Sequence, residues 1–84
     1  MMKTHFEKTM EKLSSEKEDN IQKLSKLSFD KLNELRSYYF ELYRGAEETG
    51  FKEAAKVHYY KYLIYDEAIE VKQYNEEQTW DSLS

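Results

Sequence analysis

Two histidines are the side chains in this sequence that could bind a metal ion or exchange a proton near neutral pH. His5 lies near the N-terminus, His58 lies in a tyrosine-rich segment, and the chain contains no cysteine. The positions one helical turn from His58 offer no carboxylate that could orient its ring, since they are Ala54, Ala55, Lys61 and Tyr62. Two separated histidines without thiolates do not make a zinc site. We therefore expect no metal and no cofactor.

Acidic residues could serve a hydrolytic or di-iron centre only if two carboxylates faced a common point. The adjacent pairs diverge instead by about 100° around a helix; they are Glu47/Glu48, Asp66/Glu67 and Glu76/Glu77. The sequence also lacks the Glu-x-x-His motif of di-iron bundles and a glycine-rich phosphate loop. These observations predict a protein that is not an enzyme.

The stretch VHYYKYLIYDEA, residues 57–68, places four tyrosines within seven residues. Exposed tyrosines could stack on nucleic-acid bases, but such platforms accompany a positively charged groove. The nearby lysines, Lys52, Lys56 and Lys61, are few and are mixed with acidic residues. Tyrosine buries its ring while its hydroxyl still needs a polar partner, which favours bundle edges and interfaces. We interpret these tyrosines mainly as core and subunit interface, with an exposed docking patch as the alternative.

Length and charge limit the class of protein. Eighty-four residues form one small domain, and the net charge of −4 disfavours binding to a phosphate backbone. The N-terminus has no continuous apolar run of the kind found in signal peptides, and no stretch approaches the length of a spanning helix. A cytoplasmic protein with no membrane segment is the expectation.

The sequence predicts an all-α fold, because it contains no proline and only two glycines, Gly45 and Gly50. Its core should be an antiparallel helical hairpin of residues 28–49 and 51–74. Ser28 suits the N-cap of the first helix, and Gly50 suits a left-handed residue at its end, with Phe51 folding back on the preceding turn. The connection is short, which favours antiparallel packing.

Residues 1–27 should form a helical arm, with the helix itself at about residues 3–27. A heptad pattern runs through Phe6, Met10, Leu13, Lys17, Asn20, Leu24 and Leu27. Its two central positions, Lys17 and Asn20, are polar. We expect a largely continuous helix. Either it pairs as a coiled coil whose register Lys17 and Asn20 set, or it is a surface helix whose apolar stripe these two residues interrupt. The alternative is a break near Ser14–Ser15, with Ser15 and Glu18 forming a capping box.

The helix of residues 51–74 carries apolar residues around more than half of its circumference, although one neighbouring helix needs a stripe of only about 100°. It should therefore lie between two or more helices, either within the chain or from a second copy. We expect Tyr62 and Tyr65 to be buried and Tyr59 to remain accessible. We also expect oligomerisation to complete the bundle, with a homodimer favoured; the predicted self-association residues are Leu24, Leu27, Leu35, Tyr39, Leu42, Tyr62, Ile64 and Tyr65.

Residues 75–84 lose the helical periodicity and are predicted to be a tail. With Tyr59, its large apolar residues Trp80 and Leu83 are the predicted contacts for a partner. We expect a small non-enzymatic protein-interaction module, of bacterial, phage or mobile-element origin, that acts as an adaptor, regulator or inhibitor of a partner protein. Two other functions remain open: a nucleic-acid-associated regulator that uses the lysine-rich arm, and a structural assembly protein.

Overall fold

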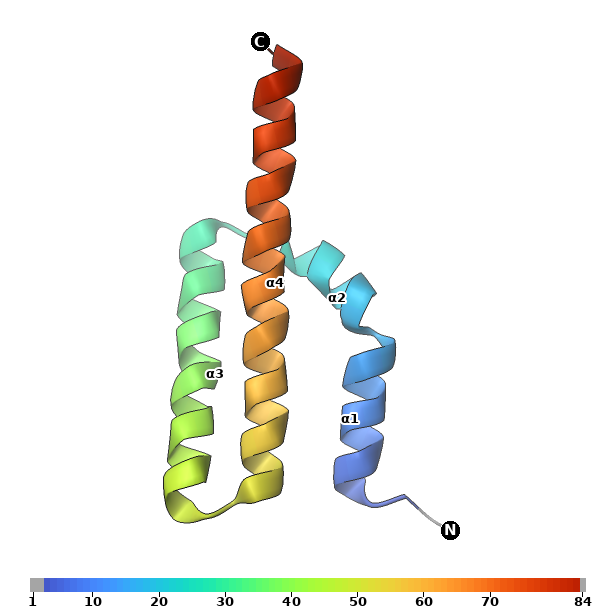
Figure 1. The fold of residues 1–84 in the computed structure, drawn as a ribbon, viewed down its shortest axis with the longest axis vertical. Coiled ribbons are helices and arrows are strands. Elements are labelled where there is room, and N and C mark those ends of the chain that lie inside the picture. The colour runs from blue at the N-terminus through green and yellow to red at the C-terminus, as the bar shows by residue number, and fades with distance from the viewer. Residues whose placement is uncertain (1–2, 84) are drawn as a thin grey trace.

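The computed structural model describes residues 3–83, with the side chains of residues 3–76, and within this range it confirms the all-α class. The helices are α1 (His5–Ser15), α2 (Lys17–Leu24), α3 (Phe29–Thr49) and α4 (Lys52–Leu83). Figure 1 shows α3 and α4 side by side and antiparallel, with α1 and α2 on the opposite side of α4. The central helix α4 therefore packs against all three of the others.

The helices lie in a single layer. The chain measures 54 × 30 × 13 Å along its principal axes. The shortest dimension is close to the diameter of one helix with its side chains, about 10–12 Å. Figure 1 views the molecule along this direction, and α4 projects well beyond the other helices at its C-terminal end. A single layer leaves both of its broad faces without a covering element.

Capping residues fix both ends of α3, as the sequence predicts. Ser28 accepts a hydrogen bond from the backbone N–H of Lys31 at 3.1 Å. At the other end, Gly50 has a left-handed backbone with φ of 81°, and the N–H of Phe51 donates to the carbonyl of Ala46 at 2.9 Å. This six-to-one hydrogen bond is characteristic of the Schellman motif. The backbone of Phe51 thus folds back on the last turn of α3, while its side chain remains exposed.

The arm is not one helix, and the expectation of a continuous helix over about residues 3–27 is wrong. It breaks at Glu16, where φ is −99° and ψ is 3°. The alternative capping box does not form either, because the Ser15 hydroxyl donates to the carbonyl of Lys12 and α2 begins without a side-chain cap. The break has a packing reason. It lets Lys17 reach Glu67 at the surface while Ile21 turns inward to become 6% exposed.

The backbone of α4 stays helical as far as Leu83, so the predicted tail of residues 75–84 is wrong over residues 75–83. No glycine or proline follows Gly50, and nothing in the sequence therefore terminates α4. The helix continues past the point where its neighbours end, and Tyr74 on this extension is exposed.

The core lies where α2, α3 and α4 meet. It consists of Ile21, Leu32, Ile64, Ala68 and Ile69, and Leu32 is completely buried. Half-buried side chains surround it from the arm and from the hairpin, among them Leu13, Leu24 and Leu27. The breadth of the apolar surface on α4 is thus explained by neighbours on two sides within the same chain.

Candidate functional site

An apolar groove crosses α4 between the arm and α3, and we call it the arm groove. Its volume is about 300 Å³, and its lining residues are Leu13, Asn20, Lys23, Leu24, Tyr39, Lys61, Ile64 and Tyr65. α4 supplies three of these side chains, α1 and α2 together supply four, and α3 supplies Tyr39. The break at Glu16 contributes to this geometry because it allows α1 and α2 to meet α4 at different angles.

Tyr39 and Tyr65 form one wall of the arm groove. Their rings stack with centroids 5.3 Å apart and an interplanar angle of 15°. Burial raises the pKa of Tyr65, and the neighbouring Tyr39 raises it further by charge and by hydrogen bonding between the two side chains. The Nζ atom of Lys61 lies 5.5 Å from the centre of the Tyr39 ring, a cation–π arrangement. The two rings of this wall therefore pack against each other, and the charge of Lys61 polarises the Tyr39 ring.

The arm groove is positively charged although the protein is acidic overall. Lys23 and Lys61 belong to its lining, and no lining residue is acidic. Among the side chains of residues 3–76, no carboxylate lies in salt-bridge range of either lysine. A positive field inside an apolar groove favours an occupant that combines apolar side chains with negative charge.

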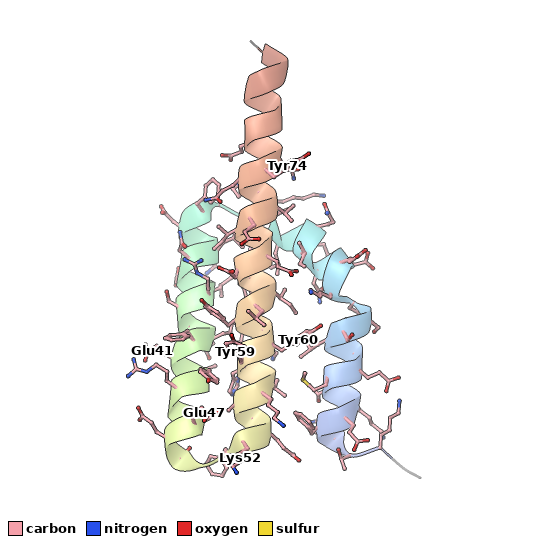
Figure 2. The ribbon with its side chains drawn as sticks, viewed as in Figure 1. Glu41, Glu47, Lys52, Tyr59, Tyr60 and Tyr74 are labelled. Atoms are coloured by element: carbon pink, nitrogen blue, oxygen red, sulfur yellow. The ribbon has the colours of Figure 1, made fainter. Side chains whose placement is uncertain are left out.

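Four aromatic rings from α3 and α4 form a second feature, which we call the aromatic face: Phe40, Tyr43, Tyr59 and Tyr62. Ring centroids are 5.0 Å apart for Tyr43 and Tyr59, 5.4 Å for Phe40 and Tyr62, and 5.9 Å for Tyr59 and Tyr62. Phe40 and Tyr59 remain 39% and 42% exposed. Figure 2 shows Tyr59 at the junction between α3 and α4. The set is a connected cluster whose outer edge faces solvent.

An ion pair joins the two helices beside the aromatic face. Arg36 donates to Asp66 across the hairpin at 2.8 Å and to Asn33 within α3 at 2.9 Å. Both charged side chains are about one third exposed. Because α3 and α4 are held together by rings and by this ion pair, the face is a preorganised surface rather than a set of independent side chains.

His58 lies partly buried on α4. Its Nδ1 atom is shielded from solvent and makes no hydrogen bond to the described residues. Burial lowers the pKa of His58, and the nearby positive charge of Lys61 lowers it further. Within the described part of the chain, no group of three or more histidine and acidic side chains could hold a metal ion.

The structure divides the predicted self-association residues among four places. Leu24, Tyr39, Ile64 and Tyr65 line the arm groove, and Tyr62 belongs to the aromatic face. Leu27 packs against the core, while Leu35 and Leu42 are half-buried on α3. Ile64 is only 4% exposed because its own chain covers it, and its contact with a second copy stays a prediction.

The predicted tyrosine burial is met only in part. Tyr59 is exposed, but Tyr62 and Tyr65 are half-buried rather than buried, because each closes an open face of the layer. The side chains of Trp80 and Leu83 lie outside those described. Sequence reasoning did not identify Lys23 and Lys61 as groove residues. Their shared location depends on how the arm packs on α4, and no local pattern encodes that packing.

No protein-family model matches the chain, and neither the curated proteins nor the solved structures include a significant match. Among the residues described, no helix has the length and apolarity needed to cross a bilayer.

Proposed function

We propose that this chain is a non-enzymatic protein-interaction module, acting as an adaptor, regulator or inhibitor, that holds an acidic and partly apolar helix of a partner protein in the arm groove. The observation that carries the proposal is the pairing of an apolar groove with two lysines that have no acidic partner among the described side chains. Helix-in-groove recognition uses apolar anchors spaced along one helix face. A groove of this volume has room for a few such anchors.

The charges favour a protein partner over nucleic acid. Two lysines of the arm already have carboxylate partners: Lys3 pairs with Glu11, and Lys17 lies 3.3 Å from Glu67. The net charge of −4 also opposes a phosphate backbone. The alternative of a nucleic-acid-associated regulator that uses the arm therefore receives no support from the arrangement of these side chains.

We also infer that a second copy completes the bundle, as a homodimer of helical hairpins with the arm folded against α4. The support is the single layer: stable domains usually pack at least two layers around a core. Among the side chains of residues 3–76, only Leu32 of the large ones is fully buried. A second layer would cover one broad face and leave the arm groove on the other free for a partner.

Zero-length cross-linking tests the proposed partner, because it joins lysine amines directly to carboxylates. We expect complexes captured from the native host to contain cross-links from Lys23 or Lys61 to aspartate or glutamate in a helix of one partner. A Lys23→Glu/Lys61→Glu variant should lose that partner by at least tenfold in quantitative mass spectrometry. The control Lys8→Glu/Lys26→Glu has the same net charge and should retain it. Equal recovery with both variants would refute the assignment of the groove.

A further inference from the structure

One face of α4 carries a stripe of side chains with positive charges towards its N-terminal end and negative charges towards its C-terminal end. We call it the α4 stripe. Its members recur every three or four residues and therefore share one face of the helix: Lys52, Lys56, Tyr59, Leu63, Glu67, Glu70 and Tyr74. Tyr59 and Leu63 are 42% and 39% exposed. Figure 2 shows Lys52 at the turn end of α4 and Tyr74 toward the other end. Both lysines precede the apolar pair, and both glutamates follow it.

The charges of the stripe are nearly antisymmetric about position 61, with lysines on one side and glutamates at similar distances on the other. Lys52 and Glu70 each lie nine residues from position 61, and Tyr59 and Leu63 each lie two residues from it. Lys56 and Glu67 lie five and six residues away on opposite sides. If a second α4 packs antiparallel across this point, the lysines of each copy meet the glutamates of the other. Tyr59 then meets Leu63 at the centre.

We propose that the chain forms a two-fold symmetric dimer in which the α4 stripes of two copies pack antiparallel, with Lys52 and Lys56 of each copy against Glu70 and Glu67 of the other. The dimer deepens the proposed function, because it specifies how the second copy completes the bundle. A two-fold axis makes every contact occur twice, which suits a surface complementary to itself. Parallel packing would instead bring lysine to lysine and glutamate to glutamate.

The aromatic face extends the same contact toward α3. Tyr59 belongs both to the α4 stripe and to the ring cluster. Phe40, which contacts Tyr62 in the same cluster, is 39% exposed. A second copy centred on Tyr59 and Leu63 would therefore cover exposed aromatic edges as well as the stripe. Protein interfaces typically have aromatic side chains at their centre and charged side chains at their rim.

The surface area of the chain matches what a dimer needs. Its accessible surface is 6532 Å². A compact monomer of 10.2 kDa would expose about 5,300 Å² by the scaling of area with mass. The difference, about 1,200 Å², exceeds the roughly 800 Å² that each partner buries in a standard interface. A face-to-face dimer on one side of the layer can therefore use area that the monomer leaves exposed.

Glu67 already contacts the arm, and this limits its part in the dimer. Its carboxylate lies 3.3 Å from the Nζ atom of Lys17, and both side chains are substantially exposed. Glu70 has no lysine or arginine within salt-bridge range among the described side chains. The pair of Lys52 and Glu70 is thus the better probe of the geometry.

Charge reversal tests the antiparallel arrangement in the full-length chain by sedimentation velocity over a wide concentration range. We expect the unaltered chain to dimerise, and Lys52→Glu or Glu70→Lys alone to raise the dimer Kd by about tenfold or more, since each reversal creates two like-charge contacts. Combining the two reversals should restore the dimer. Lys26→Glu and Glu34→Lys are the matched controls at exposed positions outside the stripe. Circular dichroism of each variant establishes that the helices remain folded.

Cysteine trapping gives an independent measurement, because the chain has no cysteine of its own. A mixture of Tyr59→Cys and Leu63→Cys proteins should oxidise mainly to the mixed dimer rather than to either pure dimer. A chain that stays monomeric at every concentration would overturn the dimer and leave the arm groove to its own cross-linking test. A dimer that ignores the reversals, or is weakened further by combining them, would overturn the antiparallel α4 contact alone.

Discussion

Substitution by alanine should change the stability of the chain in opposite directions at two glycines, one inside α3 and one directly after it. Gly50 follows the last turn with φ of 81°, and Gly45 lies inside the helix. A Cβ atom added at either position meets nothing within 4 Å. Steric contact therefore cannot distinguish the two sites, and backbone conformation alone should decide the sign.

The magnitudes follow from that difference. At Gly50, alanine must adopt a left-handed conformation that costs about 1–2 kcal/mol. Alanine also reduces the conformational freedom of the unfolded chain, which offsets roughly 0.4–1 kcal/mol of that cost. Gly50→Ala should thus destabilise by about 1 kcal/mol. Gly45→Ala should stabilise by about 0.5–1 kcal/mol, since glycine is unfavourable inside a helix by that amount.

Urea denaturation followed by far-ultraviolet circular dichroism would measure both effects, at a fixed protein concentration because a dimer adds its own stability. The corresponding change in Tm is about 4–8 °C for each kcal/mol in a domain of this size. Equal stabilisation by both substitutions would contradict the reasoning. It would mean that residue 50 has a helical backbone and that α3 and α4 form one continuous helix rather than two packed helices.

Three further variants test the capping, the core and the pH dependence. Ser28→Ala should cost about 0.5–2 kcal/mol, because it removes the hydrogen bond to the Lys31 N–H, whereas Ser37→Ala on the exposed surface should cost nothing in the same denaturation assay. Leu32→Ala should cost about 3–5 kcal/mol and leave the chain partly unfolded at 25 °C, as measured by near-ultraviolet circular dichroism. The pKa of His58 is lowered in the folded chain, so the unfolded chain binds more protons, and stability should decrease as pH falls below about 6.5. The variant His58→Leu should reduce this pH dependence. Denaturation midpoints of both proteins at about pH 7.5 and 5.5 would measure the difference.

The ends of α3 could be predicted from the sequence because each depends on one residue and its immediate neighbours. A serine hydroxyl reaches a backbone N–H three residues ahead, and a glycine accepts a left-handed backbone, whatever surrounds them. Ser28 and Gly50 therefore occupy the predicted positions. The exposed polar side of α3 also follows from helical periodicity, as Asn33 and Glu34 show.

The arm and the groove could not be predicted in the same way because their geometry depends on contacts between distant residues. The heptad pattern favours a straight helix, but a straight helix would keep Lys17 and Asn20 on its apolar stripe. In the structure the helix breaks at Glu16 and Ile21 is buried, and tertiary packing of this kind can override a local helical preference. Tyr39 and Leu13 meet in one groove only after this packing has occurred.

The central place of α4 also constrains the order in which the protein can fold during synthesis. Ribosomes release α1, α2 and α3 before α4, and each of the three packs against α4. Until residues 52–71 have left the exit tunnel, Leu32 and Ile21 have no Ile64 or Ala68 to cover them. The nascent segments therefore keep their apolar sides exposed until α4 emerges, and the core can form only then.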